Sequence, residues 1–347
     1  MNLRSLVCSV LASAFMLPMH AMGESVARDQ NASRVHVPHL FNGDSPVVLV
    51  QETEFHTTPY SHDDGEVGST LVVGKALGGM RHGAAVALDG EPMAQLTRYE
   101  NELFPLMSVV KLPLAVVVLH RVEQGQLRLG DHYHLGEEDM DPNTWSPLQK
   151  RFPKGGSFTL ETLLQASLCE SDNNACNYLF RLVGGPQCVH QFFKTYYGSC
   201  FPLRIAVTEK EMALDAAAMS ENCATPAAML RVLEDLYSAA TFPTQHPLLT
   251  PPMARLLLAY MEQTTTGQER LRAGLPSGEL AFAHKTGSSG TVGGCTLAHN
   301  DVGIIRLPDG RHACIVSFIT DCSESAATMN QAHAQLAEKT YRALTAK

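Results

Sequence analysis

The stretch FPLMSVVKLPL, Phe104–Leu114, places a serine and a lysine at the head of an apolar run. The run predicts a core helix, on which Ser108 and Lys111 face the same way because they are three residues apart. A serine hydroxyl is a weak nucleophile until a neighbouring base takes its proton, and the lysine amine can reach it. The pair is a candidate reaction centre, although S-x-x-K also occurs by chance with a solvated lysine.

Outward from this stretch, the apolar periodicity changes twice. From His82 onward, apolar residues alternate around an Asp89-Gly90 turn signal, which predicts a β-hairpin. Residues 108 to about 250 instead place apolar residues three and four apart, which is typical of helices. Residues 280–321 return to strands with a Pro308-Asp309-Gly310 hairpin turn, and a final helix begins at Ala326 and ends near Leu344.

Strands on both sides of a helical middle predict an α/β (α+β) fold. One antiparallel sheet is built from both chain ends and flanked by helices, and an all-helical lobe is inserted between them. We expect residues 79–107 and 254–347 to form the α/β lobe and residues 108–253 the helical lobe. A ligand cleft is expected where the lobes meet. Residues 22–78 have weak periodicity and predict a poorly ordered N-terminal extension.

The N-terminus resembles a secretory signal. Arg4 precedes a mostly apolar run, and residues 19–21 end in the small Ala21. The alternative is a buried N-terminal helix. No other run approaches the roughly 18 apolar residues of a membrane-spanning helix. We therefore expect a periplasmic or secreted protein, cleaved after Ala21, with no membrane in its mature form.

Composition narrows the choice of partners. Beyond Ala21 the chain carries 25 basic and 35 acidic residues, which argues against nucleic acid or an anionic membrane as a partner. The 15 histidines include the pair in DHYH, Asp131–His134, but no third ligand stands at a recognisable spacing, so we expect no metal and a surface strand or turn there. Eight cysteines follow Ala21, either as disulfides or as buried thiols.

A second polar motif lies between two helical stretches, at Ser171-Asp172-Asn173. The Ser171 hydroxyl can pass a proton to a leaving group, and the Asn173 amide offers both a donor and an acceptor to an amide substrate. The alternative is a helix cap, since all three residue types favour that position.

A third motif, HKTGSSG, lies on a predicted strand and contains Lys285, Thr286, Gly287 and Ser288. Its small residues would let a substrate lie alongside the strand, and a free strand amide can donate to a developing oxyanion. The lysine would add a positive field for an anionic substrate. The alternative is an ordinary glycine bulge.

Taken together, S-x-x-K, S-D-N and K-T-G occur in the order typical of class A β-lactamases and penicillin-binding proteins. From about residue 80 to its end the chain resembles the class A serine β-lactamases, through FPLMSVVK, SDNNACNYLF, LVGGP, TPAAM and HKTGSSG. TEKEM and NDVGIIRLPDGR make it most similar to the extended-spectrum subgroup with an altered omega loop. The resemblance implies the serine β-lactamase/D,D-peptidase fold and hydrolysis of β-lactams through a serine acyl-enzyme, which gives antibiotic resistance. It also implies a small-molecule β-lactam substrate, a monomer and no cofactor.

The resemblance also implies roles for single residues. The base that activates the deacylating water is expected seventeen residues before Pro226, at Glu209, with Glu211 as the alternative. Ser108 would be the nucleophile, and either Lys111 or Glu209 its base. Two departures stand out. Ala213 replaces an asparagine that usually helps to hold the water, and an omega-loop salt bridge is replaced by the uncharged Val207 and Asn222.

The resemblance implies a substrate-binding set as well. Arg270 would bind the substrate carboxylate, with Arg272 as a structural arginine, although the two could be exchanged. Trp145 would lie at the cleft entrance, or else be an ordinary half-buried tryptophan. The two later motifs supply the other site residues. Asn173, Thr286, Gly287 and Ser288 would contact the substrate, while Ser171, assisted by Lys285, would pass a proton to the departing nitrogen.

Two rivals remain at this point. A penicillin-binding D,D-peptidase shares all three motifs but lacks the glutamate of the omega loop. A non-hydrolytic β-lactam sensor on the same fold would be acylated once without turnover, and Ala213 keeps that reading open.

Overall fold

The central sheet draws its strands from both ends of the described chain. In the computed structural model its order is β1 (Arg81–Leu88), β10 (His312–Cys322), β9 (Cys295–Arg306) and β7 (Ala281–Ser288), all antiparallel, with the short β8 (Thr291–Val292) paired to β9. The structure describes residues 79–88, 98–215, 217–242, 247–278 and 280–346, all within the unit Gly43–Lys347. The predicted fold class is confirmed.

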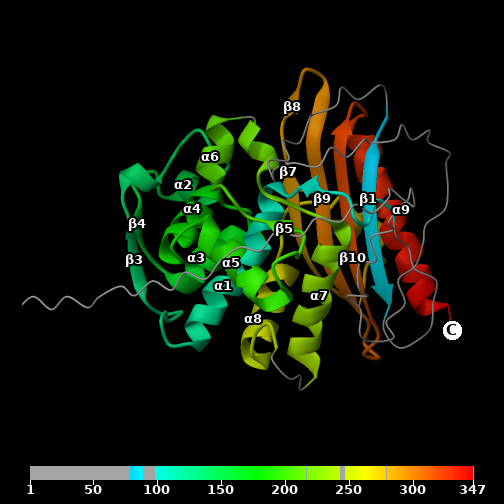
Figure 1. Cartoon of the computed structure of the whole chain (residues 1–347), viewed down its shortest axis with the longest axis horizontal. Helices are drawn as coiled ribbons and strands as arrows, with labels where there is room; N and C mark the ends of the chain where they lie inside the picture. Colours follow the sequence, from blue (N-terminus) through cyan, green and yellow to red (C-terminus); the bar gives the residue numbers. More distant parts are fainter. Residues whose placement is uncertain (1–78, 89–97, 216, 243–246, 279, 347) are drawn as a thin grey trace, which may run out of the picture. The chain divides into compact units, whose positions relative to one another are not determined.

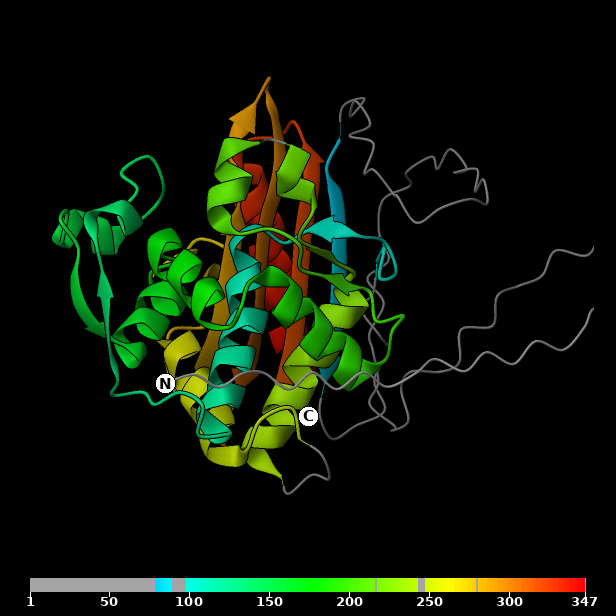
Figure 2. The same cartoon turned by 60° about the vertical axis from the view of Figure 1, so that its left-hand side comes forward.

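Alternation along the strands divides the core into two layers. In β1, Ala84, Val86 and Leu88 contribute to the apolar cluster beneath α9 (Ala326–Thr345), while the intervening Ala85 and Ala87 contribute to the cluster on the other face. Successive strand side chains point to opposite faces, so a strand with both faces covered is apolar throughout. Figures 1 and 2 show α9 along one face of the sheet and the remaining helices on the other.

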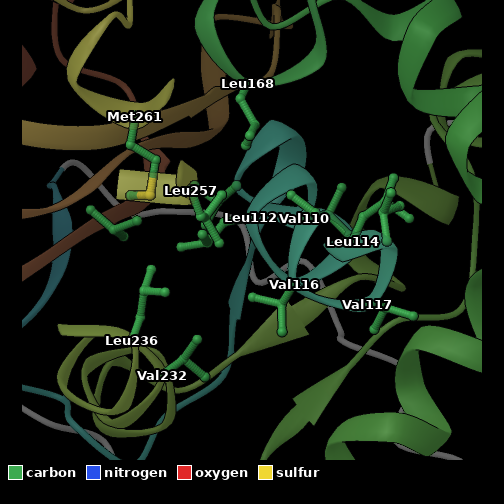
Figure 3. Packing of buried hydrophobic residues seen from close by; sticks show 14 of the residues in the cluster. Val110, Leu112, Leu114, Val116, Val117, Leu168, Val232, Leu236, Leu257 and Met261 are labelled. Carbon is green, nitrogen blue, oxygen red and sulfur yellow. The ribbon is translucent and has the colours of Figure 1, made fainter. Parts of the chain in front are cut away.

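The helix that follows the first motif lies at the centre of the helical side. A 3-10 turn, η1 (Met107–Val110), leads into α1 (Lys111–Glu123), whose first nine residues are all buried. Figure 3 shows Leu112 and Val116 of α1 among residues of other helices, including Val232, Leu236 and Leu257. Each fully buried side chain of this kind stabilises the fold by about 1.5–3 kcal/mol, so the packing holds the start of α1 in a fixed position.

The other elements connect these layers. The helices are α2 (Pro147–Arg151), α3 (Leu160–Cys169), α4 (Asn173–Leu182), α5 (Pro186–Tyr197), α6 (Glu209–Leu214), α7 (Pro226–Thr241) and α8 (Pro251–Glu262), with 3-10 turns η2 (Glu137–Asp139), η3 (Ala217–Ser220) and η4 (Leu271–Gly274). The short strands are β2 (Phe104–Pro105), β3 (His132–Leu135), β4 (Gly156–Thr159), β5 (Leu203–Arg204) and β6 (Cys223–Ala224). Helices α7 and α8 both lie against the sheet, so the helices from the middle of the chain also cover its inner face.

Most predicted elements are found, and the differences have local causes. The Pro308-Asp309-Gly310 turn joins β9 to β10, with Gly310 at φ 92°. The Asp89-Gly90 turn lies outside the described residues, although Ala84 forms an antiparallel bridge with Arg98. DHYH contains the start of the surface strand β3. The helical region extends past residue 250, to the end of α8. Two prolines occupy the first turn of α8 and are tolerated there, because the N–H groups of a first turn form no intrahelical bonds.

Other expectations concern features outside the fold itself. Residues 1–21 and 22–78, the predicted signal and extension, lie outside the described part of the chain. Within the described part, no helix is long and apolar enough to cross a membrane. The eight cysteines that follow Ala21 are all free thiols in this structure, five of them buried.

Candidate active site

Ser108 lies in the 3-10 turn η1, directly after a residue in a strained conformation. Met107 has φ 47°, in the left-handed region that a non-glycine residue occupies at a cost of about 1–3 kcal/mol. The preceding backbone is held from two sides: Leu106 N–H donates to the Asn222 carbonyl (2.8 Å), and the Asn300 side-chain amide donates to the Pro105 carbonyl (2.7 Å). These contacts fix the direction in which Ser108 points.

Lys111 lies one 3-10 turn after Ser108, and residues three apart eclipse in such a turn. Its fully buried amine donates to Ser108 Oγ (2.5 Å), to Asn173 Oδ1 (2.7 Å) and to the Glu209 carboxylate. Ser108 in turn donates its hydroxyl proton to Glu209 Oε1 (3.0 Å). The structure therefore brings a serine, a lysine and a glutamate from three separate segments into one hydrogen-bonded cluster that can remove the serine proton.

The local structure of α6 separates the two candidate glutamates. Glu209 is its first residue and is only 5% exposed, with its carboxylate against Ser108 and Lys111. Glu211 is the third residue, and its exposed carboxylate accepts from Thr208 N–H (2.7 Å) and Thr208 Oγ1 (2.8 Å) in a capping box. Only Glu209 reaches the cluster.

The second motif both caps a helix and faces the cluster. Asp172 is the N-cap of α4, and its buried side chain accepts from Ala175 N–H (2.9 Å). Ser171, on one side of it, has φ 58°, and Asn173, on the other, binds Lys111. Asp172 therefore serves as the helix cap, while Ser171 and Asn173 are directed to the two lysines.

Lys285 lies at the other side of Ser171. Its fully buried amine donates to Ser171 Oγ (3.0 Å) and to the Thr286 carbonyl (2.8 Å). Burial, followed by repulsion from the Lys111 ammonium, lowers the pKa of Lys285 to about 7. A lysine with this pKa exchanges its proton near neutral pH, so it can supply one through the Ser171 hydroxyl.

Arg270 and the end of β7 form a polar wall. The guanidinium is 8% exposed and donates to Ser288 Oγ (2.6 Å) and to the Asn300 carbonyl (2.7 Å). Thr286 Oγ1 shares a hydrogen bond with Thr266 Oγ1 (2.6 Å). A buried arginine beside two hydroxyls provides charge-assisted donors for a carboxylate.

Gly287 lets β7 approach the serine closely. A Cβ at this position would lie 2.4 Å from the Leu106 carbonyl oxygen and 3.2 Å from Ser108 N, both in the backbone. Neither group can move without disturbing the serine. Gly287 is therefore required for the contact between β7 and η1, a role separate from the predicted one of letting a substrate lie alongside the strand.

We expect Gly287→Ala to lower kcat/KM by about 10²-fold or more, because a displacement of roughly 1 Å at a reacting group has this effect. Gly290→Ala is the matched control, since a Cβ there meets nothing within 4 Å. Steady-state hydrolysis and thermal melts of both variants separate lost catalysis from lost folding. Equal activity of the two variants would show that the contact is unimportant.

The loop that carries Glu209 is anchored by an uncharged residue. The buried Asn222 side chain accepts from Ala206 N–H (2.8 Å) and Val207 N–H (3.1 Å) and donates to the Val207 carbonyl (2.9 Å). The expectation that this loop is held by something other than a charged pair at positions 207 and 222 has its physical explanation here, because one amide satisfies three backbone groups. An exposed ion pair between Arg204 and Glu221 also joins the two ends of the loop.

These groups border a cavity of about 480 Å³. Its lining includes nine of the predicted site residues: Ser108, Trp145, Ser171, Asn173, Glu209, Arg270, Thr286, Gly287 and Ser288. Lys111 and Lys285 lie behind it, fully buried. Trp145 is 54% exposed, and its indole N–H donates to the Glu170 carbonyl (2.9 Å). Sequence reasoning missed Thr144, which accepts from the Asn173 amide (2.7 Å), and Thr266; no local signal marks either residue.

Two serine–lysine pairs that meet across one cavity, with a glutamate against the more reactive serine, are typical of hydrolases that work through a serine acyl-enzyme. A model of the β-lactamase enzyme family matches residues 80–344. The chain therefore belongs to that family, and its relatives place it among the class A enzymes.

The relatives cover most of the chain. The extended-spectrum β-lactamase PER-1 of Pseudomonas aeruginosa is 34% identical over 301 residues, or 86% of this chain and 92% of PER-1. β-Lactamase VEB-1 of the same species is 31% identical over 296 residues, or 85% and 96%. The crystal structure of a β-lactamase from Chitinophaga pinensis matches with a TM-score of 0.70 at 34% identity, covering 79% of this chain and 96% of that one.

Proposed function

We propose that the protein hydrolyses the β-lactam amide through an acyl-enzyme on Ser108 and so confers resistance to β-lactam antibiotics. The observation that carries this proposal is the hydrogen bond from Ser108 to Glu209 (3.0 Å). A carboxylate at this distance can also hold a water against an ester formed on the serine, and such a base allows turnover instead of permanent acylation.

The proposed sequence of steps uses the clustered groups in turn. Ser108 attacks the lactam carbonyl, while Lys111 and Glu209 are both within reach of its proton. The Ser108 and Ser288 backbone amides stabilise the oxyanion. Ser171, supplied by Lys285, protonates the departing nitrogen. Glu209 then removes a proton from water, which attacks the ester and releases Ser108.

At the other end of the substrate, binding depends on the wall formed by β7. We propose that Arg270, Ser288 and Thr286 hold the substrate carboxylate, which is supported by the burial of the guanidinium and by its bond to Ser288 Oγ. Asn173 would contact the side-chain amide of the substrate, and the exposed Trp145 would border its entrance.

We also propose membership of the extended-spectrum subgroup with an altered omega loop. It is supported by the Asn222 anchor, which replaces a salt bridge, and by the similarity to a protein named as an extended-spectrum enzyme. Export to the periplasm or the medium is proposed from the signal-like residues 1–21 alone.

The test is the turnover of nitrocefin by the purified protein. We expect many turnovers per molecule, and a loss of about 10⁴-fold or more in Ser108→Ala, because removal of a catalytic serine has an effect of this size. A D,D-peptidase or a sensor would instead show a single burst of one equivalent, with an intact mass raised by the whole antibiotic. That burst without turnover would overturn the proposal.

A further inference from the structure

One charged group of the cavity is not used by the steps above. The lining contains two carboxylates, Glu209 and Glu269. Glu209 is 5% exposed and engaged with Ser108 and Lys111, whereas Glu269 is exposed to solvent. Among the contacts of the described residues, no hydrogen bond or ion pair engages the Glu269 carboxylate. Its carboxylate borders the cavity, where it interacts electrostatically with the neighbouring Arg270 but forms no hydrogen bond to a described residue.

The position of this charge along the cavity follows from its neighbour. Glu269 immediately precedes Arg270, whose guanidinium lies against Ser288. Arg270 is the only basic residue among the described lining residues, and two of its donor groups are already bound to protein oxygens. The end of the cavity that is proposed to bind the substrate carboxylate thus contains the buried, positively charged Arg270 and the exposed carboxylate of Glu269.

This arrangement affects one part of a β-lactam more than the rest. In a cephalosporin, the ring carbon that bears the carboxylate is bonded to the carbon that bears the variable substituent of the six-membered ring. When the carboxylate lies against Arg270 and Ser288, that substituent lies at the same end and extends towards solvent, next to Glu269. A cationic substituent would be attracted there and a neutral one would not.

We propose that Glu269 is a specificity-determining residue that favours cephalosporins whose six-membered ring carries a cationic substituent beside the carboxylate. The inference rests on the proposed function, since it assumes that Arg270 binds the carboxylate. It assigns to Glu269 a selective role and no part in bond making or breaking.

The experiment compares cephaloridine with cephalothin. Both carry the same thienylacetamido side chain, and they differ only in a pyridinium group against a neutral acetoxy group at the variable position. The measured quantity is the ratio of their kcat/KM values. Differences in intrinsic reactivity between the two compounds cancel when this ratio is compared between the parent enzyme and a variant.

We expect Glu269→Gln to lower the cephaloridine-to-cephalothin ratio about three- to tenfold at low salt. Coulomb's law gives this range for charges roughly 8 Å apart when the effective dielectric constant is about 30–65, between the values for a protein surface and for water. The change should arise mainly in KM, and it should shrink in 0.5 M NaCl because exposed charges are screened. Glu269→Lys should lower the ratio further. Since the side chain is exposed and unpaired, neither variant should alter the melting temperature appreciably.

Glu338→Gln on α9 is the matched control, because it makes the same change of charge on an exposed side chain outside the cavity. It should leave the ratio unchanged. An unchanged ratio in Glu269→Gln would overturn the inference, and so would an equal change for both substrates, which would mean that Glu269 acts on the shared carboxylate. If the parent protein hydrolysed nitrocefin but neither of these compounds, the inference would be overturned and the proposed function would stand. Hydrolysis of none of the three would overturn the proposed function.

Discussion

Glu209→Gln is expected to stop the reaction at the acyl-enzyme, with kcat for a penicillin falling about 10²- to 10⁴-fold. Glutamine keeps the size of the side chain and can still accept from Lys111, but it cannot take a proton from water. Intact mass spectrometry after mixing should show the protein carrying one whole antibiotic on Ser108 for minutes. The parent protein should return to its free mass once the antibiotic is consumed.

Glu211→Gln is the matched control for this prediction. Its carboxylate serves the capping box at Thr208 and does not reach Ser108. A glutamine at that position can still complete a capping box, so kcat should change by less than about twofold. If Glu209→Gln turned over at the parent rate, or if Glu211→Gln trapped the acyl-enzyme instead, the assignment of the base would be wrong.

The same variant also addresses the acylation base. If acylation of Glu209→Gln remains fast in a stopped-flow experiment while deacylation stops, Lys111 alone is sufficient to activate Ser108. If both steps slow by similar factors, Glu209 takes part in both. The geometry permits either result, since Ser108 Oγ is hydrogen-bonded to both Glu209 and Lys111.

How far the sequence predicts this site depends on the range of each signal. Ser108 and Lys111 are three residues apart, so local periodicity is enough to put this pair on one side of its turn. Periodicity does not place Ser171 beside Asn173, because Ser171 precedes α4 and has a left-handed φ of 58°. The order of strands and helices then predicts that the motifs meet between sheet and helices. The spacing to Pro226 already favoured Glu209 over Glu211. The capping box supplies the physical reason, since the third residue of α6 turns back to Thr208 and only the first is directed inward.

Contacts that depend on unrelated segments could not be predicted. Asn222 holds Ala206 and Val207 through backbone groups, and backbone groups carry no sequence signal. For the same reason, the closeness of Gly287 to the Leu106 carbonyl appears only once β7 is set against η1.

Three histidines also meet across the sheet from the helical lobe, of which His299 and His333 are buried and His82 is half-buried. His333 of α9 shares hydrogen bonds with Ser317 Oγ through Nδ1 (2.7 Å) and with His299 through Nε2 (3.1 Å), and His82 Nε2 shares one with the same Ser317 oxygen (2.7 Å). Burial is the main cause that lowers all three pKa values. It lowers the pKa of His82 to about 4 and that of His299 to about 3, with added repulsion from Arg98 and Arg270 respectively.

His333 is fully buried, and its pKa lies well below the usual value because of burial and, next, of the other two histidines. All three rings are therefore neutral in the folded protein at neutral pH. In the unfolded chain the same rings titrate near 6.5. Below that pH the unfolded chain binds more protons than the folded protein, so acid favours unfolding.

The contribution of the three histidines to the stability is accordingly expected to be level above about pH 6.5 and to fall as the pH drops below it. Each histidine contributes a slope of about 1.4 kcal/mol per pH unit, so the three together contribute at most about 4 kcal/mol per unit. Glu234 acts in the opposite sense, because burial raises its pKa to about 7 and its protonation favours the folded state. The difference between the parent and a histidine variant removes the contribution of Glu234, which is common to both.

His333→Gln is expected to make the decline between pH 6.5 and pH 5 shallower by about 1.4 kcal/mol per pH unit, although it costs about 1–3 kcal/mol at pH 7.5 through poorer hydrogen bonding. The measurement is urea unfolding at several pH values. His134→Gln is the control, since that ring lies exposed on β3 and its loss should leave the curve parallel to that of the parent. If the His333→Gln curve were also parallel, the histidine group would not be the source of acid sensitivity, and the carboxylates that titrate below pH 5 would have to account for it.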